Sequence, residues 1–335
     1  MIPFRTFGEA LYAKINQKLY IRSSWGELYP LEKAPGTLRI VCFGGSTTYD
    51  SVNDKHYPLL LQTELREKLG RDNIEVINLG YPGYATPHAL ILLALDVISW
   101  KPDLAILSEN VNDLSVGWFP GGFTFDYANK YGQPFYSIPD YGSLYSVANV
   151  LLGNFEFYWF IKERADRLRI KTKPLLHPLQ RKSYGDEPSP AAKEVFERNL
   201  QSFITLAEAN RICVVLGTQP LERDEAYQEL ADVIQGFKEY RGVVYYPLHS
   251  ELVKHHQIFN RIIMEVAAKR GVLLVDSDRA LGGQPIYFID QVHYTKEGLT
   301  VLAHSYAEAI LNLLGHDTRH RDPKKPDRGF GSKAR

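Results

Sequence analysis

Residues 38–48, Leu-Arg-Ile-Val-Cys-Phe-Gly-Gly-Ser-Thr-Thr, join a short apolar run to a glycine turn and a serine. The run predicts a buried β-strand over residues 38–43, and the two glycines permit a sharp turn after it. Ser46 then stands where a helix begins, with backbone N–H groups directed at whatever its hydroxyl attacks. Taken alone, the turn also fits a helix-capping serine or a phosphate-binding loop. It lacks, however, the P-loop pattern and the third glycine of a dinucleotide site.

Four further apolar runs follow, and most are separated by segments with helical spacing. The runs cover residues 74–78, 104–108, 212–217 and 272–275, and the helical segments cover residues 57–69, 87–100, 191–210, 250–270 and 296–314. Short apolar strands that alternate with helices predict an α/β fold, with a central parallel sheet of about five strands covered on both faces. Such sheets bind ligands in the loops that follow the carboxyl ends of their strands.

The composition excludes several classes of protein. The chain has 335 residues, 39 Lys and Arg against 39 Asp and Glu, and 44% hydrophobic residues. This hydrophobic share supports a globular core, and the balanced charge argues against a nucleic-acid partner. Cys42 and Cys213 lie in apolar runs, which predicts buried free thiols rather than a disulfide framework or a zinc site. No signal peptide or membrane-spanning run is readable, so the sequence predicts a cytoplasmic protein if Met1 is the native start.

Three segments depart from the alternating pattern. Residues 1–36 are predicted to form an N-terminal extension to a domain over residues 37–315, and residues 316–335 a disordered basic tail. An insertion is predicted over residues 118–190, ending in a loop; its first 43 residues hold 15 aromatic side chains. These side chains either pack as a small core, form a lid or wall for a substrate, or touch a membrane surface.

Four loops hold the residue types that acyl transfer needs. Besides Ser46, Gly80 follows the second strand in Asn-Leu-Gly-Tyr-Pro-Gly, and Asn112 follows the third in Asn-Val-Asn-Asp. Asp290 and His293 precede the last helix in Asp-Gln-Val-His. Each segment alone is as readily a turn or a cap. Together they supply a nucleophile, oxyanion donors and a base, with a carboxylate at a spacing that orients the imidazole.

These segments resemble, in order, the sequence blocks of the SGNH (GDSL-type) hydrolases, over about residues 39–314. The resemblance implies the family's flavodoxin-like, three-layer α/β/α sandwich. It also implies a triad of Ser46, His293 and Asp290, and an oxyanion hole made by the N–H groups of Ser46 and Gly80 with the amide of Asn112. No metal or cofactor is implied.

The sequence departs from the family pattern at two positions. Gly45 stands where the first block usually has aspartate, which leaves the nucleophile intact. Asn110 stands where the third block usually has glycine. We expect the Asn110 side chain to narrow the pocket or to shift Asn112.

The predicted function is a serine esterase that cleaves acyl esters, with short-chain or carbohydrate O-acetyl esters as expected substrates. Two alternatives stay open, an O-acyltransferase that uses the same site and a noncatalytic glycan-binding module, although a poised triad argues against the module. Asp276 and Asp278 are alternative carboxylates for His293. His255 and His256 fall on a predicted helix and are expected to be structural or solvated. The oligomeric state is not predicted.

Overall fold

The fold is described for most of the chain outside the aromatic insertion. The computed structural model describes residues 11–53, 55–118, 123–127, 181–185, 187–224 and 243–319. Most of the predicted insertion and most of the predicted tail lie outside the described residues, so the roles proposed for them stay predictions.

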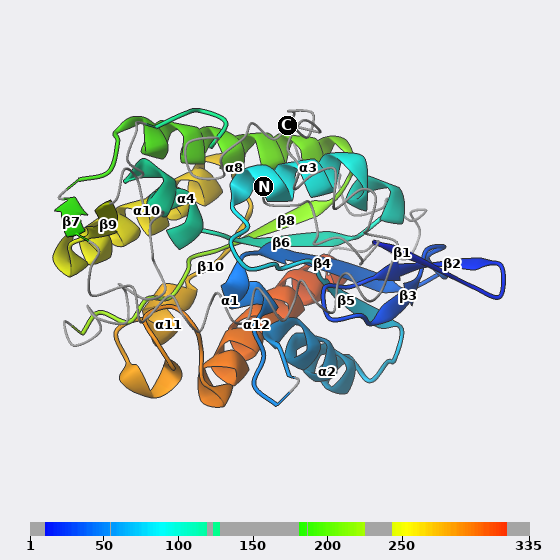
Figure 1. Ribbon diagram of the computed structural model, residues 1–335. Helices are drawn as coiled ribbons and strands as arrows, with labels where there is room; N and C mark the ends of the chain where they lie inside the picture. The colour runs from blue at the N-terminus through cyan, green and yellow to red at the C-terminus, as the bar shows by residue number, and fades with distance from the viewer. Residues whose placement is uncertain are drawn as a thin grey trace, which may run out of the picture.

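A five-stranded parallel sheet forms the centre of the molecule (Figure 1). Its strands are β4 (Leu38–Gly44), β5 (Ile74–Asn78), β6 (Leu104–Ser108), β8 (Cys213–Gly217) and β10 (Leu273–Val275), each within one residue of its predicted bounds. Their spatial order is β5-β4-β6-β8-β10. This is the 2-1-3-4-5 order of flavodoxin-like sheets, in which ligands bind where the direction of winding reverses, here between β4 and β6. The predicted α/β class is confirmed.

Helices cover both faces of the sheet (Figure 1). One face carries α3 (Thr86–Leu95), α8 (Ala191–Ala209) and α10 (His249–Arg270), and the other carries α2 (Tyr57–Leu69) and α12 (Lys296–Arg319). Successive side chains of β4 alternate between the two cores, as Val41 packs with the first group and Cys42 with the second. A strand buried on both faces is mostly apolar, which is why each one reads as a run of apolar residues with few interruptions.

Three elements differ from the prediction. The helix predicted over residues 87–100 breaks at Asp96, whose carbonyl accepts from the backbone N–H and hydroxyl of Ser99, and the 3₁₀ helix η1 (Val97–Trp100) follows. Short polar side chains compete in this way with helical bonding. The loop predicted over residues 177–190 contains strand β7 (Arg181–Gly185), paired in parallel with β9 (Val243–Pro247). The last helix runs past residue 314, its predicted end.

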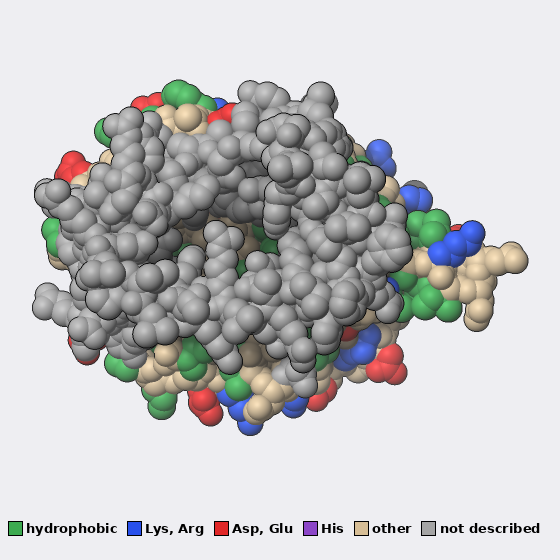
Figure 2. All heavy atoms as spheres, in the orientation of Figure 1, with side chains coloured by type: hydrophobic (Ala, Val, Ile, Leu, Met, Phe, Trp, Pro, Cys, Tyr) green, Lys and Arg blue, Asp and Glu red, His purple; other side chains and the backbone are tan. Residues whose placement is uncertain are grey.

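The N-terminal part of the described chain forms a separate antiparallel sheet. It consists of β1 (Tyr12–Ile15), β2 (Lys18–Arg22) and β3 (Leu28–Pro30). Asn16 and Gln17 join β1 to β2 with φ angles of 47° and 65°, the backbone of a tight hairpin turn. This hairpin projects from the body at the right of Figures 1 and 2.

Arg39 connects this small sheet to the main one. The side chain is fully buried in β4, and its Nε donates to Glu75 Oε2 over 2.6 Å. The remaining guanidinium N–H groups donate to backbone carbonyls, including that of Pro30 at the end of β3 (2.7 Å). A buried guanidinium needs this many partners because an unpaired buried charge is costly.

Cys42 is fully buried, as predicted, and burial raises the pKa of its thiol to about 12. Cys213 is only partly buried because it begins strand β8, so its predicted burial is corrected. Neither cysteine is in a disulfide bond. No helix in the described part of the chain is long and apolar enough to cross a membrane.

Candidate active site

The loops at the carboxyl ends of the neighbouring strands β4 and β6 bring the first two candidate residues together. Ser46 is the first residue of the short helix α1 (Ser46–Tyr49), and Asn112 lies in the first turn of α4 (Val111–Gly117). The Nδ2 of Asn112 donates to the carbonyl of Tyr84 over 2.7 Å. A Cβ added to Gly45 would stand 2.4 Å from this Nδ2, so a side chain at position 45 would require the Asn112 amide to move.

His293 lies between Ser46 and Asp290. Its Nε2 is 2.8 Å from Ser46 Oγ, and its Nδ1 is 2.6 Å from Asp290 Oδ2. The other carboxylate oxygen of Asp290 accepts the backbone N–H groups of Val292 and His293, both over 2.8 Å. Asp290 is therefore held by its own loop and directed at the imidazole. The three residues predicted to work together are in contact.

The contact between Asp290 and His293 shifts the pKa values of both residues. Burial acts to raise the pKa of Asp290, but the hydrogen bond and charge of His293, with two backbone N–H groups, outweigh it and lower the pKa. Burial acts to lower the pKa of His293, but the hydrogen bond and charge of Asp290, with a smaller contribution from Asp50, raise it. The folded protein thus favours an ionised Asp290 beside a basic imidazole.

Residues 42–300, more than half of the chain, match the GDSL-like Lipase/Acylhydrolase family. The chain belongs to this family. Membership makes the protein a hydrolase of the esterase and acylhydrolase class. No curated protein has a sequence that matches this GDSL-like chain.

Solved structures of the family have a similar fold at low sequence identity. A lipase/acylhydrolase from Enterococcus faecalis is 16% identical, with a TM-score of 0.47 over 83% of this chain and 97% of its own. The acetylxylan esterase Axe2 from Geobacillus stearothermophilus is 14% identical, with a TM-score of 0.46 over 82% of this chain and 95% of its own. A GDSL-like lipase from Bacteroides thetaiotaomicron is 16% identical, with a TM-score of 0.44 over 82% of this chain and 88% of its own.

Gly80, a predicted oxyanion donor, lies in a loop that packs against α1 in this GDSL-like site. Its backbone N–H donates to Asn78 Oδ1 over 2.8 Å and is therefore used within its own loop. A Cβ on Gly80 would stand 2.6 Å from the backbone nitrogen of Tyr49 and 2.7 Å from Thr48 Cβ. The glycine is needed because this loop lies directly against α1. The same closeness lets the Asn78 amide donate to the Thr48 carbonyl (2.9 Å).

The departure of Asn110 from the family pattern led us to expect that its side chain narrows the pocket. In the structure this side chain is directed elsewhere. It is fully buried, and its amide donates to the carbonyl of His256 (3.0 Å) and to Asn260 Oδ1 (2.8 Å), both on α10. In this GDSL-like chain the asparagine therefore attaches the start of α4 to α10.

Gln219, which follows β8, joins the elements that carry Ser46 and Asn112, and the sequence analysis did not identify it. Its Oε1 accepts the N–H of Val111 (2.8 Å), and its Nε2 donates to Thr47 Oγ1 (3.0 Å). Its own backbone exchanges two hydrogen bonds with the Asn260 amide. The sequence signal was its place at the carboxyl end of a strand, where polar side chains meet.

Asp50 is the second residue that the sequence analysis did not identify. It follows the last residue of α1, and its Oδ2 lies 3.2 Å from His293 Nε2. Burial raises the pKa of this carboxyl, although the charge of His293 opposes the shift. The spacing of four residues from Ser46 was the signal, because residues one helical turn apart share a face.

The alternative residues weighed from the sequence have other partners. Asp276 accepts from Thr218 Oγ1 over 2.9 Å, and Asp278 pairs with Arg223 over 2.6 Å. His256 is fully buried, and burial lowers its pKa to about 3; His255 is also buried. Both histidines are therefore packed in the structure rather than solvated.

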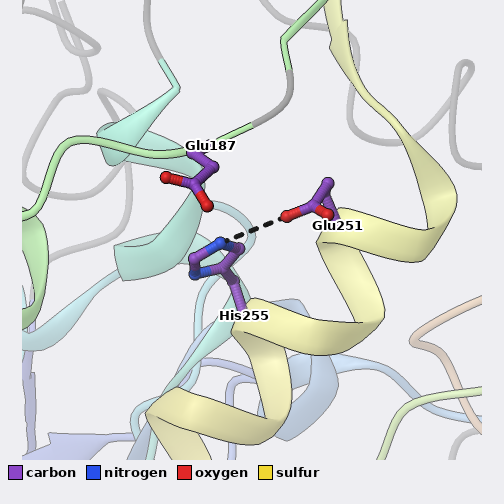
Figure 3. Close-up of side chains that lie close together, drawn as sticks. All are labelled: Glu187, Glu251 and His255. Atoms are coloured by element: carbon purple, nitrogen blue, oxygen red, sulfur yellow. Dashed lines mark ion pairs between the residues drawn. The ribbon is translucent and has the colours of Figure 1, made fainter.

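Among the described residues, one group has the spacing of metal ligands. One donor atom from each of Glu187, Glu251 and His255 lies within 4.8 Å of the others (Figure 3). The Nζ of Lys254, however, is 2.9 Å from Glu251 Oε2 and 3.4 Å from Glu187 Oε1. This ammonium lies against both carboxylates, so we interpret the group as an ion-pair network.

Proposed function

We propose that this GDSL-like protein is a serine esterase in which Ser46 is the nucleophile, His293 the general base and Asp290 the residue that orients it. The observation that carries the proposal is the chain of contacts from Ser46 Oγ to His293 Nε2 (2.8 Å) and from His293 Nδ1 to Asp290 Oδ2 (2.6 Å). These are the hydrogen bonds that activate a serine for attack on a carbonyl.

In the first half of the reaction, Ser46 Oγ bonds to the ester carbonyl carbon while His293 Nε2 takes the hydroxyl proton. Asp290 stabilises the imidazolium and keeps the proton of Nδ1 in place. When the tetrahedral intermediate collapses, the imidazolium gives its proton to the leaving alcohol and an acyl-serine remains. Water then repeats the sequence with His293 as base, releasing the acid and restoring the Ser46 hydroxyl.

Two donors are positioned to stabilise the negative oxygen of the intermediate. The N–H of Ser46 is the first of a helix and has no partner within that helix. The Asn112 Nδ2 lies directly beside Gly45, the residue before the nucleophile. One such donor stabilises the transition state by roughly 3–4 kcal/mol. Ser46 and Asn112 are the oxyanion donors that this proposal uses.

We further propose that the substrates are short-chain esters or carbohydrate O-acyl esters. Aromatic rings lie close to the nucleophile: Tyr49, three residues after Ser46, stacks on Trp25 at a centroid distance of 5.2 Å and meets Tyr81 edge to face at 5.8 Å. Rings of this kind suit small acyl groups and the faces of sugars. No observation on the described residues favours the acyltransferase or the glycan-binding alternative.

The test compares wild type and Ser46→Ala in the hydrolysis of p-nitrophenyl acetate and butyrate. We expect turnover by the wild type and only the background rate for the variant, with the same thermal unfolding midpoint. Labelling by a fluorophosphonate, located by mass spectrometry, should modify Ser46 in the wild type. Turnover retained by Ser46→Ala would refute the mechanism, and a wild type that is neither active nor labelled would refute the function.

A further inference from the structure

Two oxygens compete for one nitrogen of His293. Nε2 lies 2.8 Å from Ser46 Oγ and 3.2 Å from Asp50 Oδ2. When Nδ1 carries the proton that Asp290 accepts, a neutral imidazole presents only a lone pair at Nε2. That lone pair accepts the Ser46 hydroxyl proton but repels an ionised carboxylate. The contact with Asp50 is therefore favourable only when a proton lies between Asp50 and Nε2.

We propose that Asp50 is a positioning residue that competes with Ser46 for His293 Nε2 and stabilises a protonated resting form of the site. This inference rests on the proposed esterase function. Asp50 is placed for the role because it follows α1 directly, one helical turn after Ser46. Its side chain is 38% exposed, so water and substrate reach it, whereas the Asp290 side chain is 15% exposed.

The charges around His293 favour its protonated form. Within the described chain, the charged groups that act on His293 are Asp290, from its own loop, and Asp50, from the end of α1. A neutral imidazole leaves two carboxylates without a cation, whereas an imidazolium places a cation between them. Asp50 thus adds to the effect of Asp290 in raising the pKa of His293 against the opposing effect of burial.

The sign of the effect on activity depends on pH. A general base must be neutral, so activity falls as the pH drops through the pKa of His293, and a raised pKa moves this loss to higher pH. Above that pKa the same interaction helps, because Asp50 stabilises the imidazolium formed in the transition state and a more basic imidazole accepts a proton more readily. Asp50 therefore slows the enzyme in acid and speeds it in alkali.

The kinetic test is the pH profile of kcat/KM for p-nitrophenyl acetate, measured from about pH 5 to pH 9, across the range in which histidines titrate. Asp50→Asn removes the charge and keeps the shape. We expect the variant to be faster than wild type at the acid end, by up to about tenfold, and severalfold slower on the alkaline plateau. The control Asp72→Asn removes the charge of an exposed aspartate elsewhere and should follow the wild-type profile. Profiles for Asp50→Asn and wild type that run parallel would overturn the inference.

A second readout does not depend on catalysis. The His293 ring proton is followed by NMR titration in Ser46→Ala and in Ser46→Ala with Asp50→Asn, and its signal is assigned by its loss on His293→Gln. We expect the midpoint to fall to lower pH in the double variant. A midpoint that falls although wild type hydrolyses no ester leaves the contact established and refutes only the esterase function. An unchanged midpoint refutes the role of Asp50.

Discussion

The two halves of the proposed active site are held in place by different kinds of contact. Asp290 and His293 are three residues apart, and the backbone of their own loop positions the carboxylate. Ser46 and Asn112 lie on α1 and α4, which Gln219 joins through its contacts with Thr47 and the N–H of Val111. The acid–base half is a local structure, whereas the serine half depends on residues that are distant in the sequence.

This difference shows where specific positioning in the site originates. A carboxylate that accepts two backbone N–H groups and a ring N–H forms its geometry within one turn of chain. A nucleophile and an oxyanion donor on separate helices need a buried polar link, and such links hold only when every member is satisfied. Changes in the first half should therefore affect the chemistry alone, and changes in the second should affect chemistry and stability together.

The largest effect tests the local half. Asp290→Asn keeps an oxygen for the two backbone N–H groups but presents an amide N–H to His293 Nδ1. The imidazole then carries its proton on Nε2 and cannot accept from Ser46. We expect kcat/KM for p-nitrophenyl acetate to fall about 10⁴-fold, the loss typical of a triad aspartate replaced with its geometry intact.

Asp290→Asn should also leave the fold unchanged. The thermal unfolding midpoint of Asp290→Asn should stay near that of wild type, and Asp72→Asn should keep full activity. A fall of less than tenfold would show that Asp290 is not the residue that orients the base.

A smaller effect is expected where the two halves meet at the carbonyl oxygen of the substrate. Asn112→Ala removes one proposed oxyanion donor, and kcat should fall by about 10²–10³-fold with little change in KM, because the lost bond strengthens only in the transition state. Asn210→Ala, a matched change of an exposed asparagine at the end of α8, should leave kcat unchanged. A rise in KM at constant kcat would instead assign Asn112 to substrate binding.

The sequence predicted the features of the fold that short-range patterns determine. Apolar runs located the five strands, because strands buried on both faces are mostly apolar. The spacing of Asp290 and His293 placed them in contact, and the GDSL-like family match agrees with the blocks that contain them. Helix bounds failed where a local polar contact decided the outcome, as at Asp96.

The remainder depended on tertiary contacts that no local pattern records. Gly80 has to be a glycine because its loop lies against Thr48 and Tyr49 of α1, about thirty residues earlier in the chain. Asn110 was expected in the pocket, yet its partners lie on α10. Strand β7 pairs with β9, which is distant in the sequence. The role of Gln219 also depends on tertiary structure, since its contacts form only when β4, β6 and β8 are side by side.

The smallest expected effect tests the long-range half at Gln219. Gln219→Met keeps the length of the side chain but leaves the Val111 N–H and the Thr47 hydroxyl without this partner. Leaving buried groups unsatisfied should lower the free energy of unfolding by about 1–3 kcal/mol, measured by urea denaturation. Because α1 and α4 are no longer joined, kcat should also fall severalfold.

Thr47→Val removes one end of the link and provides the matched test of coupling. If Gln219 acts through Thr47, the stability loss of the double variant should be smaller than the sum of the two single losses, because both remove the same hydrogen bond. Additive losses would mean that Gln219 stabilises the fold through α4 alone, and that α1 is held by its packing against the Gly80 loop. In that outcome the serine half would be almost as local as the acid–base half, and the contrast between them would disappear.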